Sequence, residues 1–458
     1  MAERWLVVGG GFRGIIGAYL LASKGKDAIL LNRGKNLGGE LYSDWNGFCL
    51  DRGCRLFSNS DDTTTAILMD ILEDNVAPIM VRYASVTNRI KTDGVSIPDL
   101  GAYGQDAGRD ILRELVKASA QPDGECRNLQ EKLDARFGAT AGRYLAAAAY
   151  KMYRTEPVTL EAESFRMTPF RRIKFLADSV TDVLKENPVL DDRVASSSQS
   201  DPMRFYRDRA GAYPYRNFYP KAHGLRGFCE KAQERLDKLG VSVLLGQAME
   251  RLDINSRGAA VVLSNGEEIR GDYMLWTSGL EPLEKFLGLE NTIGAYIHHV
   301  PMVLHYFVIE KAAEGPYTYL QNFDREDCVF RASVPGSYGA NTCPDGLSYV
   351  CCEVPTTIGS PEWNSPEECA QRAWAELQRY GVVRSDRWLE TKTEKTPISY
   401  WIPKIGYLKV AHGITSRLQD KPRFVASDEL VFSMNGIISS LLQLIGDARH
   451  GAPIRDSV

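Results

Sequence analysis

Three glycines near the N-terminus form the first pattern in this 458-residue chain that could do chemistry. Gly9, Gly11 and Gly14 follow the order G-x-G-x-x-G within "VVGGGFRGIIG". The first glycine of such a pattern permits a tight turn, the second lets backbone N–H groups approach a pyrophosphate, and the third lets a helix pack closely on a strand. The pattern therefore predicts a dinucleotide site at a helix N-terminus, with Phe12 and Arg13 in the first helical turn.

The residue expected to hold the ribose departs from this pattern. A dinucleotide fingerprint usually places an acidic residue about 20 residues on, at the end of the second strand. Here "AILLNR" places Asn32 and Arg33 there. An amide can hydrogen-bond ribose hydroxyls without the strength of a charged carboxylate, whereas an arginine fork suits a 2′-phosphate. On these residues alone, NADP(H) competes with FAD.

A second glycine turn follows the second strand. Gly38 and Gly39, with Glu40 behind them, precede the segment "LDRGCRLF". This order resembles the FAD-binding flavoprotein superfamily that contains amine oxidases, protoporphyrinogen oxidase, phytoene desaturases and UDP-galactopyranose mutase. In that superfamily the doublet is usually GG(R/H), and a D-x-G segment lies beneath the flavin. The resemblance implies that all three residues of this turn lie at the cofactor.

Three later segments continue the resemblance in the superfamily's order. "NLQEKLDARFGATAGRYLAAAAYKMYRTEPVTLEAES" is similar to its helical segment. "FYPKAHGLRGFCEKAQERLDKLGVSVLLGQAMERL" resembles the return to the FAD domain, where Met249 takes the place of a valine whose backbone contacts adenine. "FVASDELVFSMNGIISSLLQL" resembles the closing motif, with Asp428 near the ribityl chain and Met434 and Asn435 at the start of a helix. The resemblance implies FAD rather than NADP(H), despite Asn32, Glu40 and Ser427 at positions that normally touch the cofactor.

Four residues are candidates for the catalytic site. Arg55 lies in the segment that resembles the loop beneath the flavin, where it could steer an anionic group or stabilise charge on the reduced flavin; a structural salt bridge is the alternative. Arg331 in "VFRASVP" resembles a segment of the mutase-like and protoporphyrinogen-oxidase-like branch and is expected to face the substrate. Tyr400 and Trp401 in "PISYWIPKIGY" resemble an aromatic stretch close to the flavin, with core packing as the alternative.

The elements that must position these residues begin as a strand, a helix and a strand. Trp5 to Val8, Arg13 to Lys24 and "DAILL" carry those patterns in turn. Apolar β-rich runs from residue 300 to 354 predict a second sheet. With the resemblance, the expected fold class is α/β: a Rossmann-type, glutathione-reductase-2-like FAD-binding domain, a β-sheet substrate domain and a helical insertion. The predicted boundaries are 1–75, 216–285 and 416–458 for the discontinuous FAD-binding domain, 76–215 for the mainly helical insertion and 286–415 for the β-rich substrate domain.

Composition limits the partners. The net charge is -4, from 55 Lys and Arg against 59 Asp and Glu, and no basic tract occurs, which gives no reason to expect nucleic acid or an anionic membrane. The nine cysteines include no C-x-x-C pair and indicate reduced thiols in a cytoplasmic protein. Glycines interrupt the first apolar run, and no other segment is expected to span a bilayer. The six histidines form no H-E-x-x-H or ligand cluster, so no metal is expected. A small molecule is the expected partner, and the oligomeric state stays open.

Three functions fit the resemblance. The first is an FAD-dependent oxidoreductase that transfers a hydride from a small polar substrate to flavin N5. The second is a redox-neutral flavoenzyme on a nucleotide sugar that resembles UDP-galactopyranose mutase, although Glu40 stands where that enzyme's signature has a histidine. The third is a degenerate, non-catalytic flavoprotein-like binding subunit, suggested by the three departures at the cofactor.

Overall fold

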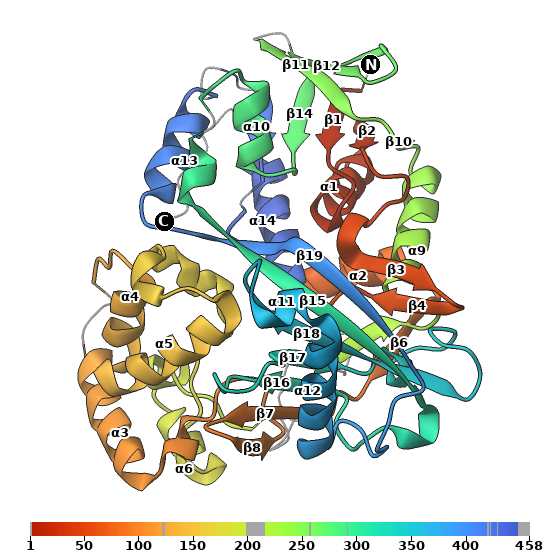
Figure 1. Ribbon diagram of the computed structural model, residues 1–458. Coiled ribbons are helices and arrows are strands. Elements are labelled where there is room, and N and C mark those ends of the chain that lie inside the picture. The colour runs from red at the N-terminus through yellow and green to blue at the C-terminus, as the bar shows by residue number, and fades with distance from the viewer. Residues whose placement is uncertain are drawn as a thin grey trace.

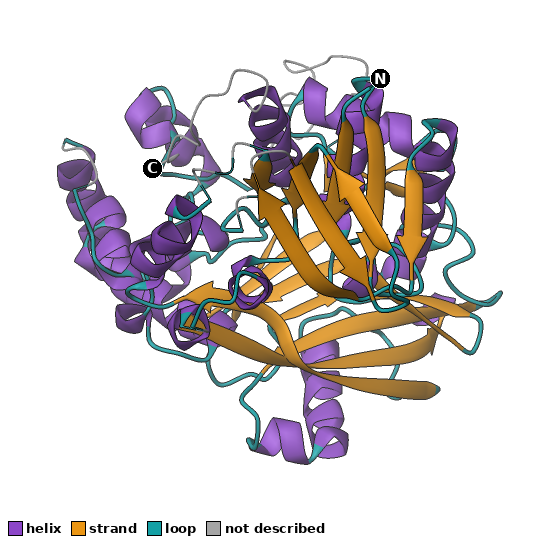
Figure 2. Cartoon of the chain, turned by 90° about the horizontal axis from the view of Figure 1, so that it is seen from above, coloured by secondary structure: helices purple, strands orange, loops and turns teal. Residues whose placement is uncertain are grey.

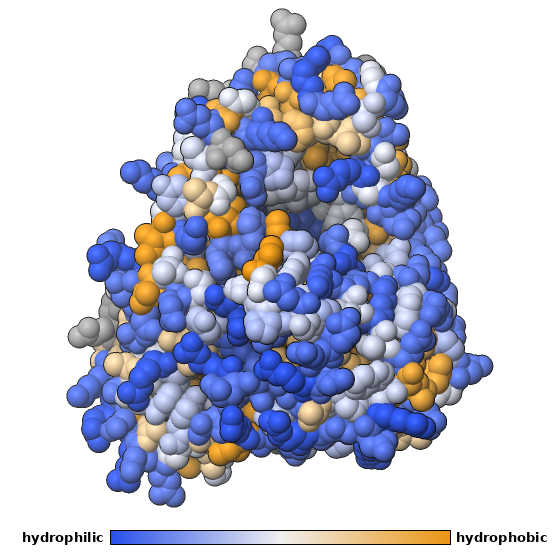
Figure 3. All heavy atoms as spheres, in the orientation of Figure 1, coloured by the Kyte–Doolittle hydropathy of each residue, from blue (hydrophilic) through white to orange (hydrophobic). Residues whose placement is uncertain are grey.

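The computed structural model describes most of the chain: residues 2–120, 124–197, 216–255, 258–290, 292–418, 421, 423–427 and 429–447. Figure 1 shows two principal sheets, one above the other, with a group of helices to the left of the lower one. Seen from above in Figure 2, the same helical group lies to one side of both sheets. On the face shown in Figure 3, hydrophobic side chains form small areas separated by hydrophilic ones.

The first sheet is parallel throughout and has the strand order β10-β2-β1-β14-β20. Along β1, Leu6 and Val8 face one hydrophobic cluster and Val7 faces another, because successive side chains of a strand point to opposite faces. Burial on both faces is what a parallel sheet requires. The elements of this part are β1 (Arg4–Val8), α1 (Phe12–Ser23), β2 (Asp27–Asn32), β10 (Ser242–Leu245), β14 (Tyr273–Trp276), β20 (Phe424–Ala426) and α14 (Met434–Asp447). The predicted α/β class, with a Rossmann-type strand–helix–strand start, is confirmed.

Smaller elements surround the first sheet. One face carries a three-stranded antiparallel sheet of β11, β12 and β13, and the helices α1, α9 and α14 pack in the cluster on the other face. Their bounds are η1 (Gly39–Leu41), β3 (Tyr42–Trp45), β4 (Phe48–Asp51), β5 (Phe57–Ser58), α2 (Asp62–Leu72), β6 (Val76–Ile79), β9 (Asn217–Pro220), α9 (Gly224–Lys238), β11 (Met249–Asn255), β12 (Gly258–Leu263), β13 (Glu268–Gly271), α10 (Leu280–Phe286), η5 (Ile293–Tyr296) and α13 (Tyr407–Ser416).

The second sheet has the strand order β19-β15-β18-β17-β16-β7-β8. Its strands are β7 (Tyr83–Thr87), β8 (Ile90–Asp93), β15 (Ile297–Glu310), β16 (Tyr319–Asn322), β17 (Arg331–Ser333), β18 (Leu347–Pro355) and β19 (Glu390–Pro403). The helix α12 (Pro366–Arg379) packs on one face, and η6 (Lys311–Ala313), η7 (Pro335–Ser337) and α11 (Pro361–Asn364) lie in the connections. β7 and β8 fall within 76–215, which was predicted to be mainly helical, and β7 joins this sheet beside β16. Strands this short carry too little periodicity to be separated from helix by pattern alone.

The helical group packs around its own core of Leu115, Leu133, Phe137 and Leu145. It consists of η2 (Leu100–Tyr103), α3 (Gln105–Ser119), α4 (Leu129–Phe137), α5 (Ala139–Tyr153), η3 (Pro157–Thr159), η4 (Ala162–Met167), α6 (Asp178–Leu184) and α7 (Pro188–Asp191). Within the described ranges, no helix combines the length and apolar character needed to cross a bilayer. The domain boundaries given above stay a prediction.

Candidate functional site

The two glycine turns are joined to each other. The N–H of Gly38 donates to the carbonyl oxygen of Gly10 at 2.8 Å. A Cβ on Gly14 would overlap the carbonyl oxygen of Gly9, so α1 can pack at this distance only with glycine there. By contrast, a Cβ on Gly11 or Gly39 would meet open space. The structure therefore leaves an open side on each turn, as a bound pyrophosphate requires.

The N-terminus of α1 is open to a ligand. Its N-cap is Gly11, which has no side chain to accept from the first-turn N–H groups. Phe12 is buried and packs against Phe228 with ring centroids 5.6 Å apart, so its side chain belongs to the core and only its backbone lies at the predicted cofactor position. Arg13 donates to the carbonyl oxygens of Glu429, at 3.3 Å, and Val431. Arg13 thus ties α1 to the loop before α14.

The side chain of Asn32 lies over the first glycine turn. Its Oδ1 accepts from the N–H of Gly10 at 3.2 Å. Its Nδ2 donates to the carbonyl oxygens of Gly34 at 3.1 Å and Asn36 at 2.8 Å. Both amide hydrogens are therefore engaged by the loop, and Asn32 can offer a ribose only its oxygen. Arg33, next to it, is exposed.

The other predicted cofactor residues come from three places in the chain. The N–H of Gln247 donates to the carbonyl oxygen of Asn32 at 3.3 Å, which brings the segment before Met249 to the end of β2. Asn435 is buried in the first turn of α14 beside Met434, and its amide donates to the Thr64 hydroxyl at 2.7 Å. Asp428 lies outside the described residues.

Glu40 stays at the surface beside the second glycine turn. Its carboxylate pairs with Arg52, whose guanidinium also lies 3.2 Å from the Glu394 carboxylate of β19. Glu40 therefore belongs to a chain of charges that links this turn to the edge of the second sheet.

Arg331 is held by a buried acid. Its Nε lies 2.9 Å from Oε1 of Glu353 and its Nη2 lies 2.7 Å from Oε2, while Glu353 is 3% exposed. The same carboxylate accepts from the N–H of Cys54 at 2.6 Å. Burial disfavours both charges, yet the attraction between the partners holds the pKa of Arg331 above and that of Glu353 below the usual value. Glu353 therefore joins the segment of Arg55 to the second sheet and fixes the orientation of Arg331.

Arg55 lies near this ion pair. Desolvation by the surrounding protein and the charge of Arg331 lower the pKa of Arg55, while Glu353 and Asp51 act in the opposite direction. Its side chain nevertheless keeps accessible surface, and so does that of Arg331. The structure thus brings together the two arginines that the sequence singled out; we call them the Arg55–Arg331 pair.

Tyr400 and Trp401 do not form one aromatic wall. They are neighbours in β19, and strand alternation places them on opposite faces. The Tyr400 hydroxyl donates to the carbonyl oxygen of Met152, and its ring meets Tyr153 edge to face at 6.2 Å. Trp401 packs against Tyr407, with ring centroids 5.3 Å apart, in the cluster beside the first sheet. Of the two, Tyr400 lies near Arg331 and Glu353, whereas the contacts of Trp401 lie in the cluster beside the first sheet.

Asp51 is a buried acid in the segment "LDRG" that sequence reasoning did not place among the site residues. Its carboxylate accepts from the Tyr219 hydroxyl and from the N–H of Leu225, the latter at 3.1 Å. Burial raises the pKa of Asp51 to about 7, in spite of these two donors and of Arg55. Glu353 was missed as well, although an acid within the apolar run "SYVCCEVP" is an unusual signal.

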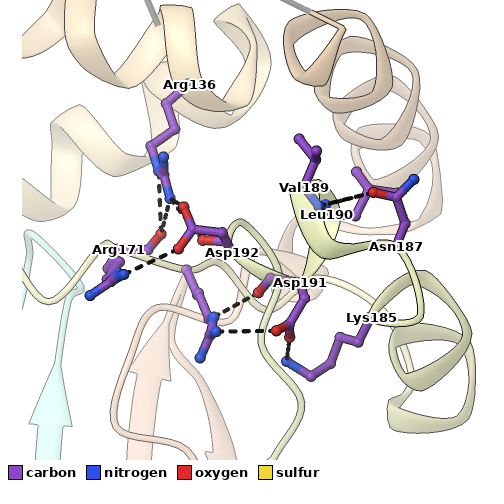
Figure 4. Close-up of polar contacts among 9 residues, drawn as sticks. Arg136, Arg171, Lys185, Asn187, Val189, Leu190, Asp191 and Asp192 are labelled. Carbon is purple, nitrogen blue, oxygen red and sulfur yellow. Dashed lines mark hydrogen bonds and ion pairs between the residues drawn. The ribbon is translucent and has the colours of Figure 1, made fainter. Parts of the chain in front are cut away.

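The paired arginines Arg171 and Arg172 are engaged within the helical group, where Figure 4 shows Arg171 beside Asp192. They lie in a turn, where Arg171 contacts Asp192 at 3.3 Å and Arg172 donates to the carbonyl oxygen of Asp191 at 2.7 Å. Arg136 reaches the other oxygen of Asp192 at 2.7 Å. These contacts fix the turn and assign the pair a structural role. Among the described residues, no group of three or more His, Cys, Asp or Glu could hold a metal ion.

Comparison with known proteins adds a family and a fold. The family model for flavin containing amine oxidoreductase matches residues 14–303. Among solved structures, a reduced UDP-galactopyranose mutase has a TM-score of 0.72 at 14% identity, covering 99% of this chain and 98% of that one. A wild-type putrescine oxidase bound to putrescine has a TM-score of 0.63 at 14% identity, with 98% and 99% covered.

A third similar structure is an oxidoreductase from Methanosarcina mazei, with a TM-score of 0.60 at 12% identity, covering 97% of this chain and 100% of that one. At these identities the solved structures establish the fold alone. No curated protein matches the chain. The resemblance given by the glycine turns and the later segments is confirmed by the family match and by the shared fold.

Proposed function

The chain belongs to the flavin-containing amine oxidoreductase family, and on that premise we propose that it is an FAD-dependent oxidoreductase acting on a small polar substrate. When bound, FAD supplies the isoalloxazine that accepts a hydride from the substrate. The open sides of Gly11 and Gly39 and the free N-terminus of α1 fit the pyrophosphate of this cofactor. The chain's own residues must then hold the cofactor, orient the substrate and exclude water.

The proposed cofactor residues divide by the part of FAD that they would hold. The two glycine turns and the first turn of α1 hold the pyrophosphate. The Oδ1 of Asn32 and the backbone around Met249 serve the adenosine end, since these segments meet at the end of β2. The first turn of α14, with Met434 and Asn435, serves the flavin end.

The Arg55–Arg331 pair is the observation that carries the proposal for the substrate. Two guanidinium groups and one carboxylate, Glu353, leave one positive charge in excess among these three groups. Glu353 occupies Nε and Nη2 of Arg331. The other N–H groups of Arg331 and those of Arg55 can then donate to an anionic group of the substrate. We propose that the pair grips this group so that a neighbouring C–N or C–C bond faces the flavin. Tyr400, whose hydroxyl is engaged by Met152, would form an apolar border that excludes water.

Spectroscopy of the purified protein tests the proposal. A yellow protein whose absorbance is bleached without oxygen by one member of a panel of amines and other polar reductants supports it. The matched control is Arg143→Gln, which removes an exposed charge from α5 and should leave bleaching unchanged. A colourless protein that gains no flavin absorbance after dialysis against FAD would exclude both flavoenzyme functions and leave the non-catalytic binding subunit.

A redox-neutral reaction on a nucleotide sugar is a second candidate. The observation that favours it is again the Arg55–Arg331 pair, since two guanidinium groups suit a diphosphate as well as a carboxylate. The two candidates differ in their need for electrons. Turnover of a nucleotide sugar only after dithionite reduction supports the second, whereas substrate-driven bleaching supports the first.

A further inference from the structure

An open cavity of about 540 Å³ lies beside the second sheet, apart from the Arg55–Arg331 pair. Its walls come from the turn between β7 and β8, the segment before β17, and α12. Arg331 and Glu353 alternate along their strands with Ala332 and Cys352, which pack with α12. The cavity therefore belongs to the side of the sheet that carries α12, the helix labelled in the lower part of Figure 1. We call it the Arg89 cavity.

Three arginines line this cavity: Arg89, Arg372 and Arg379. Arg379 pairs with Asp327 through Nη1 at 3.1 Å, and Arg372 pairs with Glu362 through Nη1 at 3.3 Å. More than half of the side chain stays exposed in both. For the Arg89 guanidinium, the described part of the chain provides neither a hydrogen bond nor an ion pair.

The acids of the cavity are occupied by the protein itself. Both oxygens of Glu376 accept backbone N–H groups, from Cys328 at 2.8 Å and Val329 at 2.9 Å, and burial raises its pKa. Asp327 is buried as well and accepts from the Tyr380 hydroxyl at 2.6 Å. These two carboxylates form the floor.

Two further groups donate hydrogen bonds to Asp327. Asn322 donates to Asp327 at 2.8 Å, and the buried ammonium of Lys151 donates to the Asp327 carbonyl oxygen. Glu326 is the one exposed carboxylate among the lining residues. The rim of the cavity therefore presents three guanidinium groups against one accessible carboxylate.

Arg89 occupies a backbone position that normally belongs to glycine. Thr87 pairs with Ile90, which leaves Asn88 and Arg89 as a two-residue hairpin turn with φ of 51° and 60°. A turn with two positive φ values favours Asn-Gly, because the second position suits a residue without a side chain. The N–H of Arg89 donates to Asp324 at 2.8 Å, which fixes the strained turn beside the cavity. Backbone strain of this kind concentrates at ligand sites.

We propose that the Arg89 cavity binds a phosphate-bearing small molecule, with Arg89 as its principal ligand and Arg372 and Arg379 as further donors. Guanidinium forks match phosphate oxygens in pairs. The volume lies within the range of about 300–1,000 Å³ that is common for small-molecule sites. A glycine would relieve the turn, whereas the arginine brings a guanidinium group into the cavity lining. This site is independent of the proposed flavin chemistry.

Calorimetry with pyrophosphate tests the proposal on the full chain saturated with FAD, so that the glycine turns near the N-terminus are already occupied. We expect saturable binding by the wild type, at least tenfold weaker binding by Arg89→Gly and by Arg372→Gln, and weakening with added salt. The control Arg109→Gln removes an exposed charge from α3, outside the cavity, and should bind as the wild type does.

The melting temperature separates a ligand role from a structural one. Arg89→Gly removes the side chain but suits the turn, so its melting temperature should equal or exceed that of the wild type while its binding is at least tenfold weaker. Three results would overturn the proposal: no saturable binding by FAD-loaded wild type, unchanged binding by Arg89→Gly, or a lower melting temperature of that variant. If the FAD-loaded protein does not bind pyrophosphate but the FAD-free protein does, pyrophosphate binds at the glycine turns instead.

Discussion

Glu353 on β18 receives the guanidinium of Arg331 on β17 in a two-point contact, 2.9 Å and 2.7 Å long, and the same carboxylate holds the N–H of Cys54. One buried acid therefore positions both the second-sheet arginine and the segment that carries Arg55. Neutralising it should release both.

The first prediction concerns Glu353→Gln. Removing one member of a buried ion pair leaves its partner uncompensated, which costs about 3–5 kcal/mol. We expect lower stability in denaturant titrations and a substrate kcat/KM reduced tenfold or more, with FAD absorbance retained. Glu362→Gln, which loses the Arg372 contact elsewhere, is the control for removal of a carboxylate. Unchanged kcat/KM would contradict the positioning role of Glu353.

The second prediction concerns Arg55→Gln. If this guanidinium holds an anionic group, its loss should weaken binding of a small carboxylate such as benzoate about tenfold, or ~1.4 kcal/mol. The flavin absorbance spectrum during titration reports this binding. Arg55→Lys should recover part of the affinity, because the charge stays while the paired donors are lost. Equal affinity in wild type and Arg55→Gln would assign Arg55 the structural salt-bridge role.

The third prediction is a pH dependence of stability caused by Asp51. Burial raises its pKa in the folded state to about 7, whereas an unfolded aspartate has a pKa of about 3.9. The folded state therefore binds more protons between these values, and the Asp51 contribution to stability is lost as pH rises from about 4 to about 7.

Denaturant titrations at pH 5 and pH 8 measure this contribution. The wild type should lose about 2–4 kcal/mol more than Asp51→Asn over this interval, because asparagine does not titrate. The Asn amide can still accept from Leu225 and donate to Tyr219, so the variant keeps the local contacts. Parallel pH profiles of the two proteins would show that Asp51 stays ionised when folded.

The fourth prediction concerns Asn32→Glu. A carboxylate can still accept from Gly10 and also binds ribose hydroxyls through charge, so FAD should bind up to tenfold more tightly. The change also removes the amide donors to the carbonyl oxygens of Gly34 and Asn36. Asn32→Asp removes the same donors but has a shorter side chain than glutamate, so it serves as the control. Fluorescence titration of the apoprotein with FAD compares the three proteins. Weaker binding by Asn32→Glu would show that the loop contacts outweigh the added charge.

The sequence predicted those parts of the fold and site that depend on local spacing. The spacing of Gly9, Gly11 and Gly14 acts mainly through the close approach of Gly14 to the Gly9 carbonyl oxygen, and the arrangement is that of the expected strand–helix–strand unit. Arg331 was singled out by its segment, but its partner Glu353 depends on the register between β17 and β18, which no local pattern encodes.

Three other features depend on tertiary structure and could not be predicted from the sequence. Tyr400 and Trp401 are adjacent in sequence, yet strand alternation separates their side chains. The turn at Arg89 lacks the glycine that marks such hairpins, so its shape was invisible in the sequence. Burial raises the pKa of Asp51 against the opposing hydrogen bonds from Tyr219 and Leu225, and these partners lie more than 160 residues along the chain, so no local pattern reveals the environment of Asp51.

The place of β20 beside β14 has a consequence for biosynthesis. The sheet that starts with β1 receives its last strand from residues 424–426, and Arg13 of α1 reaches the carbonyl oxygens of Glu429 and Val431. A ribosome that has made both glycine turns must therefore still translate more than 380 residues before this half of the molecule can close. From the synthesis of β14 until that of β20, the nascent chain will carry an unpaired edge of β14, and chaperone binding should be concentrated there.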